Sequence, residues 1–126
     1  MAEMLFYSGV AFGVSVLTGI GLLALYQWVK PEGRIWLPGA VHGLIGVAGS
    51  ALLVLGLQGP ARGVRSGAGS FGTIAAALLA AALALGLLVA AGRLRRKRPS
   101  ALVLGIHATL AVTGLTLLAA YVSAPP

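Results

Sequence analysis

The sequence predicts an all-α membrane protein in which four transmembrane helices form an up-and-down bundle built from two tandem helical hairpins. Composition predicts the membrane class, because 59% of the 126 residues are apolar and only 9% are charged, whereas about a quarter of the residues of a soluble domain are charged. The mean hydropathy of +1.00 agrees. The tandem hairpins are predicted by an internal repeat with a period of 65 residues.

Four apolar segments are each long enough to cross a hydrocarbon core, which needs about 20 helical residues. They run from about Leu5 to Val29, Ile35 to Gln58, Ser70 to Gly92 and Ala101 to Val122. We therefore expect one four-helix transmembrane domain over residues 1–126, with repeat 1 at about 1–61 and repeat 2 at about 66–126.

The segments are separated by turn-forming and charged stretches. The first segment is expected to be a retained helix, because it opens with the acidic Glu3, is longer than the apolar core of a signal peptide and has no small-x-small cleavage site after it. The turn KPEGR follows it at 30–34, and the Gly-rich loop QGPARGVRSGAGS at 58–70 separates the two repeats. Ser70 and Ser100 are the expected N-caps of the third and fourth helices.

The basic residues predict the orientation in the membrane. Seven of the nine lie in the first and third loops, which the positive-inside rule places in the cytoplasm. We therefore expect an integral protein of the bacterial inner membrane with both termini on the non-cytoplasmic side. The net charge of +7 then reflects loops that face anionic lipid headgroups, and no nucleic-acid partner is expected. The basic residues of these two loops are Lys30, Arg34, Arg93, Arg95, Arg96, Lys97 and Arg98.

The 65-residue repeat pairs the two histidines of the chain, His42 and His107. It also pairs Phe6 with Phe71 and the triplet at 21–23 with that at 86–88. Tandem hairpins form a parallel repeat, so both histidine-bearing helices enter the membrane from the same side. Each histidine lies about seven residues past the start of its apolar run, roughly 10 Å along the helix axis. We therefore expect the two imidazoles at the same depth.

The paired histidines are the candidate metal ligands. One interpretation is that each makes an ordinary hydrogen bond between helices. Ionisable residues within a membrane are energetically costly, however, and His42 and His107 are the ionisable residues that lie within the four spans. Iron of haem accepts imidazole from two opposite sides, so His42 and His107 could ligate one haem b if their helices face each other diagonally across the bundle. Such iron is six-coordinate, which favours electron transfer.

Small residues follow each histidine on its own helical face. Gly46 and Gly49 follow His42, and Ala111 and Gly114 follow His107. They predict either tight helix packing or a slot for a flat macrocycle, and in the second interpretation all four are cofactor-binding residues. The basic residues on the side where haem propionates would emerge are Lys30, Arg34, Arg93 and Arg95.

The segments VHGLIGVAG and IHATLAVTG, together with the four spans, resemble the small membrane b-type cytochromes, a class of four-helix bundles that includes the cytochrome b561-like group. The resemblance implies haem b and exchange of electrons with quinol or a redox protein. The b561-like group usually has more histidines and often two haems. This chain has two histidines and would hold one haem in that manner.

Three other functions remain open. The chain could be a cofactor-free structural or assembly subunit of a larger membrane complex, or a homo-oligomer, since the span from Ile74 to Gly92 is rich in small residues that permit close helix packing. It could bind bacteriochlorophyll through one histidine per pigment. A proton-coupled transporter would normally need a carboxylate inside the membrane, whereas the two acidic residues, Glu3 and Glu32, lie in the tail and a loop. The sequence contains no cysteine and no constellation typical of a self-contained enzyme, so an electron carrier or accessory subunit is expected.

Overall fold

The structure, a computed structural model, describes residues 1–28, 36–95 and 97–126. The described residues form four helices: α1 (Ala2–Trp28), α2 (Trp36–Gly56), α3 (Phe71–Leu94) and α4 (Ala101–Ser123). Each is long and apolar enough to span a membrane. The predicted all-α, four-span membrane fold is therefore confirmed, with α1 beginning three residues earlier than expected.

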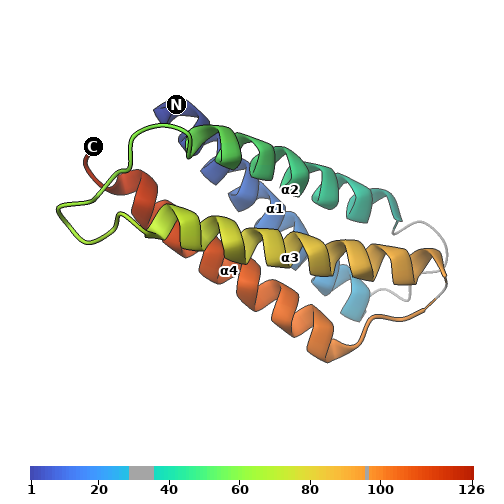
Figure 1. Cartoon of the computed structure of the whole chain (residues 1–126). Coiled ribbons are helices and arrows are strands. Elements are labelled where there is room, and N and C mark those ends of the chain that lie inside the picture. The colour runs from blue at the N-terminus through green and yellow to red at the C-terminus, as the bar shows by residue number, and fades with distance from the viewer. Residues whose placement is uncertain (29–35, 96) are drawn as a thin grey trace.

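The helices form two hairpins (Figure 1). α1 packs against α2, and α3 against α4, far more extensively than α1 packs against α4 or α2 against α3. α1 and α3 are therefore diagonal partners across the bundle, as are α2 and α4. Both termini and the segment between α2 and α3 lie at one end, here called the terminal end. α1 and α3 end at the opposite end, here called the connection end, where α2 and α4 begin.

The buried residues show which positions of the two repeats are structurally equivalent. On the second helix of each hairpin the predicted spacing of 65 holds, because Gly49, Leu53 and Gly56 on α2 and Gly114, Leu118 and Tyr121 on α4 are all buried. On the first helices the spacing is 67. The buried residues there are Leu5, Ser8, Phe12 and Ser15 on α1, and Gly72, Ala75, Leu79 and Ala82 on α3.

This register corrects one part of the predicted repeat. Pairing Phe6 with Phe71 and Gly21 with Gly86 shifts α1 by two residues against α3. At 3.6 residues per turn that shift rotates a helix by about 200°, onto its opposite face. The matches at 65 in the first helices are therefore coincidences among common apolar residues. The first hairpin contains two more residues than the second between equivalent points of its helices.

The core occupies only one half of the bundle. Every buried helical residue lies between the terminal end and the level of Ser15, Gly46, Ala82 and Gly114; this part is the terminal half. In the remaining helical segments, 16–28, 36–45, 83–94 and 101–113, no residue that the structure describes is buried; this part is the connection half. The core cluster consists of Leu5, Phe12, Leu53, Ala75, Leu79, Leu118 and Tyr121.

Local interactions hold the ends of the helices. The hydroxyl of Ser100 accepts a hydrogen bond from the backbone N–H of Val103 at 3.2 Å, so its predicted N-cap role is confirmed. Ser70 occupies the N-cap position of α3, but its side chain makes no capping bond. At the terminal end, Arg62 donates from Nη2 to the carbonyl of Ala124 at 2.8 Å. This bond ties the segment between the hairpins to the end of α4.

Candidate metal centre

His42 and His107 meet in the middle of the bundle, although α2 and α4 are diagonal partners. Their ring centres lie 6.0 Å apart, and the ring planes make an angle of 74°. Each histidine lies six residues after the first residue of its helix, about 9 Å along the axis. The two histidines therefore lie at equivalent positions along their helices, as the repeat predicts.

Each imidazole is oriented by the first helix of its own hairpin. Nδ1 of His42 lies 2.8 Å from the backbone carbonyl oxygen of Ser15, and Nδ1 of His107 lies 2.8 Å from that of Ala82. A carbonyl oxygen can only accept, so Nδ1 carries the proton and donates it. In a neutral imidazole this leaves the lone pair on Nε2, which is the arrangement found in histidines that ligate metals.

A glycine packs against each ring. A Cβ atom added at Gly19 would lie 3.0 Å from Cε1 of His42, and one added at Gly86 would lie 3.2 Å from Cε1 of His107. Gly19 and Gly86 follow Ser15 and Ala82 by one helical turn and are themselves 67 residues apart. Any larger side chain at either position must displace the ring or the helix. These two glycines contact the candidate ligands, and the sequence pattern does not single them out, because a spacing of 65 pairs Gly86 with Gly21.

The two histidines differ in their polar surroundings. His42 Nδ1 has two hydroxyls nearby in addition to the Ser15 carbonyl: Ser15 Oγ at 3.2 Å and Thr18 Oγ1 at 3.4 Å. Thr18 Oγ1 also donates to the same Ser15 carbonyl at 2.8 Å. The equivalent residues beside His107 are Ala82 and Leu85, which have no hydroxyl. The same geometry is therefore built from a polar set in one hairpin and an apolar set in the other.

The four predicted cofactor-binding small residues lie on the terminal side of the histidines. A Cβ at Gly49 would lie 3.3 Å from the ring of Phe12, and one at Gly114 would lie 2.7 Å from Cγ of Leu79. A Cβ at Gly46 would lie 3.6 Å from Ser15 Oγ, and Ala111 is half-buried. The close contacts of Gly49 and Gly114 are those expected from tight helix packing, the other interpretation of this small-residue face.

The basic residues of the α3–α4 connection lie at the same end of the bundle as the histidines. Arg93 and Arg95, predicted to face haem propionates, are exposed at the end of α3. The other two residues of that set, Lys30 and Arg34, lie outside the described residues. Positive charge therefore marks the connection end, about two turns of α3 beyond Gly86.

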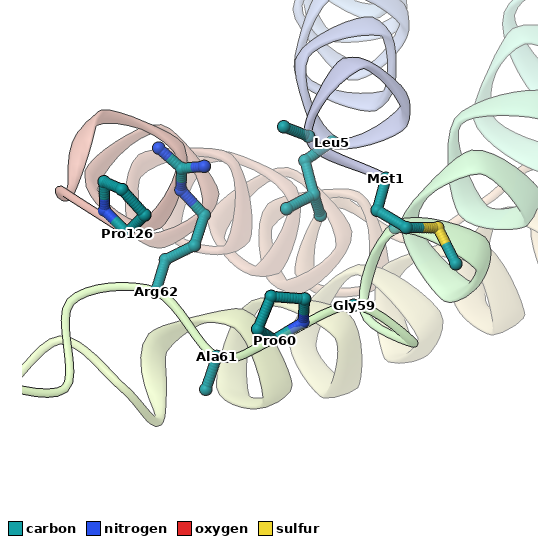
Figure 2. Close-up of a pocket in the computed structure, with 9 residues that line it drawn as sticks. Met1, Leu5, Gly59, Pro60, Ala61, Arg62 and Pro126 are labelled. Carbon is teal, nitrogen blue, oxygen red and sulfur yellow. The ribbon is translucent and has the colours of Figure 1, made fainter.

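A small cavity at the terminal end is distinct from this site (Figure 2). It has a volume of about 80 Å³ and is lined in part by Met1, Leu5, Arg62 and Pro126. Sites for drug-sized ligands and cofactors measure about 300–1,000 Å³. Gly56, which also lines it, is 14 residues from His42 along α2, about 21 Å. The cavity is therefore too small and too distant to belong to a metal centre at the histidines.

The candidate centre contains two protein ligands. Among the described residues there is no group of three or more His, Cys, Asp or Glu side chains that could hold a metal ion. No protein-family model, curated protein or solved structure matches the chain.

Proposed function

We propose that the protein binds one haem b between His42 and His107 and acts in electron transfer, alone or as a subunit of a respiratory or redox complex. This proposal rests on the distance between the ring centres of the two imidazoles. A bond between a metal and an imidazole nitrogen is about 2 Å long and the ring centre lies about 1 Å beyond that nitrogen, so two imidazoles on opposite sides of one metal have centres about 6 Å apart. The ring centres of His42 and His107 are 6.0 Å apart.

The number of protein ligands supports a tetrapyrrole. A structural zinc site uses four protein ligands and a catalytic one three, whereas this site offers two. A tetrapyrrole would bring four nitrogen ligands of its own, and His42 and His107 would supply the remaining two. Bound haem would supply iron that exchanges one electron, and ligation by two imidazoles favours electron transfer over oxygen chemistry.

The chain itself orients the ligands. The carbonyls of Ser15 and Ala82 accept from Nδ1, which leaves the lone pair of each neutral imidazole on Nε2, the atom that would bind the metal, and such hydrogen bonds raise the basicity of a ligand. Gly19 and Gly86 let each helix approach its ring closely. Backbone groups of α1 and α3 would therefore hold both rings in place. Quinol or a redox protein is the proposed electron partner.

The distance between the two imidazole rings also helps to distinguish haem binding from bacteriochlorophyll binding. One pigment per histidine does not require the histidines to meet, and 6.0 Å between ring centres leaves space for one metal between them. The geometry therefore favours a single shared metal. A cofactor-free structural subunit is the alternative that the experiment below distinguishes.

We further propose the orientation that the charges predict, in the bacterial inner membrane with both termini outside the cytoplasm. The α3–α4 connection, with Arg93, Arg95, Lys97 and Arg98, lies at the connection end. Cytoplasmic loops carry an excess of Lys and Arg. The histidines would then lie nearer to the cytoplasmic face.

The test is a reduced-minus-oxidised absorption spectrum of the protein purified after expression with haem supplementation. We expect the sharp α band of a low-spin b-type cytochrome and one haem per chain. His42→Ala and His107→Ala should each abolish or convert this band, because each removes one axial ligand. Thr116→Ala is a matched control, since it removes an exposed α4 hydroxyl that bonds only the carbonyl of Val112 in its own helix.

A colourless parent protein that is folded and monodisperse in detergent would contradict the proposal. The same is true if both alanine variants keep the parent spectrum. A cofactor-free subunit predicts the first of these results, together with alanine variants as stable as the parent.

A further inference from the structure

The connection half of the bundle lacks a core although apolar residues face its interior. The buried stripe on α1 ends at Ser15, and that on α3 ends at Ala82. The next positions at helical spacing are only half-buried and, apart from Thr18 and the two histidines, apolar. Six of these apolar residues, here called the interior positions, are Gly19, Leu22, Gly39, Gly86, Val89 and Leu104.

The histidines lie at the boundary between the two halves. On their terminal side the interior is filled, because Phe12 packs on Gly49, Leu79 packs on Gly114, and Leu53 and Leu118 are 2% and 0% exposed. On their connection side a Cβ added at Gly39 would have nothing within 4 Å. A macrocycle has its metal at its centre, so one held between the two imidazoles would extend to both sides of them and would reach into the connection half.

The two ligands belong to different hairpins, and the hairpins pack against each other much less than their own helices do. Each hairpin carries a complete half-site, consisting of one histidine, the carbonyl that orients it and the glycine against its ring. A metal that binds both histidines therefore joins the two hairpins at a level beyond which the described residues form no core.

We infer that one edge of the macrocycle lies in the connection half and that binding fixes the α1–α2 and α3–α4 hairpins relative to each other there. The inference rests on the proposed haem function and adds where the cofactor lies and what it does to the fold. The interior positions beyond the rings, Leu22, Gly39, Val89 and Leu104, become buried against the macrocycle. Arg93 lies seven residues after Gly86 on the same helical stripe, so the acidic edge of the macrocycle meets positive charge at the connection end.

Distances between spin labels on the full chain test the inference. The chain has no cysteine, so introduced cysteines are labelled specifically. Leu37→Cys with Leu102→Cys reports the diagonal α2–α4 distance in the connection half, and both residues are exposed, at 55% and 72%. Val54→Cys with Ala119→Cys is the matched control in the terminal half. Both pairs join equivalent exposed positions, 65 residues apart. Each pair is measured in apoprotein and after addition of haem, with the absorption spectrum of the same sample recorded.

With haem bound and the low-spin spectrum present, we expect the distance distribution of the 37–102 pair to narrow, while the 54–119 distribution stays unchanged. If the spectrum appears and the 37–102 distribution does not change, the inference is overturned and the haem function stands. If both distributions narrow equally, the effect is not confined to the connection half and the inference is also overturned. If no low-spin spectrum appears, the proposed function and the inference fail together.

Discussion

The two hairpins orient their histidines in the same way but surround them with different side chains. In both, a carbonyl of the first helix accepts from Nδ1 of the histidine at 2.8 Å and a glycine one turn later meets the ring. The α1–α2 hairpin surrounds its histidine with hydroxyls, and buried Ser8 donates to the carbonyl of Gly49 at 2.9 Å. The α3–α4 hairpin has Ala75 at the position equivalent to Ser8. Thus the features that orient the imidazoles are shared, and the others differ.

In the terminal half, too, the two hairpins use different residues at equivalent positions of their packing. In the first hairpin Leu5 of α1 packs on Gly56 of α2, where an added Cβ would lie 2.7 Å from the leucine side chain. In the second hairpin the large residue is on the second helix instead, since a Cβ added at Gly72 of α3 would lie 2.8 Å from the Tyr121 ring of α4. Total volume between the helices is what a packed core conserves. The contrast shows that the two repeats share space and backbone geometry at positions where their residues differ. Residue identity is kept at the histidines, at the glycines beside them, and at core pairs such as Gly49 with Gly114 and Leu53 with Leu118.

The largest effect, on haem binding, is expected from replacing Gly19, the glycine that packs against the ring of His42. Gly19→Val should abolish most haem binding, because the Cβ alone would lie 3.0 Å from Cε1 and the branched side chain must push the ring away from its partner. Gly21→Val is the matched control, since nothing lies within 4 Å of a Cβ there. The measurement is haem per chain at equal amounts of monodisperse protein. Equal loss in both variants would show that helix propensity, and not contact with the ring, explains the effect.

That pair of variants also tests the register of the repeat. The number and type of the helices, the two hairpins, the Ser100 cap and the meeting of His42 with His107 follow from hydropathy, punctuation and the rarity of histidine. The spacing of the first helices does not, because the residues that are equivalent there, such as Ser15 and Ala82, differ in chemistry. Only burial shows that they share a face. The carbonyls that orient the imidazoles are likewise invisible in sequence, since every residue has one.

A smaller effect, on the free energy of unfolding, is expected from adding a methyl group at Gly56 or Gly72, the glycines that pack against Leu5 and Tyr121. Gly56→Ala and Gly72→Ala should each destabilise the protein by about 1–3 kcal/mol, the usual cost of overpacking. Gly56→Ala should cost more, because its Cβ would also lie 3.1 Å from the backbone nitrogen of Leu5, which cannot rotate away. Unfolding in mixed micelles with increasing denaturing detergent measures the change.

Gly9→Ala is the control for these packing variants, as nothing lies within 4 Å of a Cβ at that position. Truncation of Leu5 to alanine in the Gly56→Ala background should recover part of the loss, because the two residues are in contact and their effects are not additive. No recovery, or a loss in Gly9→Ala as large as in Gly56→Ala, would contradict the assigned packing.

The smallest effect, on stability, is expected from exchanging Ser15 and Ala82, the positions at which the surroundings of the two histidines differ most in polarity. Ser15→Ala makes the His42 side resemble the Ala82 side, and it removes a hydroxyl 3.2 Å from Nδ1 and 3.3 Å from the carbonyl of His42. The protein should keep one haem per chain and lose about 0.6 kcal/mol of stability, the average for a hydrogen bond between membrane helices. The carbonyl of residue 15 still accepts from Nδ1 in the variant, as that of Ala82 does from His107.

Ala82→Ser is the reciprocal variant and should also keep its haem. Loss of haem in Ser15→Ala alone would mean that the hydroxyl, and not the carbonyl, orients His42, and that the two half-sites work differently. Retention in both variants would mean that the orienting group is the backbone. A backbone acceptor is independent of the side chain at its position, so each repeat could change residue 15 or 82 without losing the orientation of its histidine. This independence accounts for equal ligand geometry in two hairpins whose first helices share so little sequence.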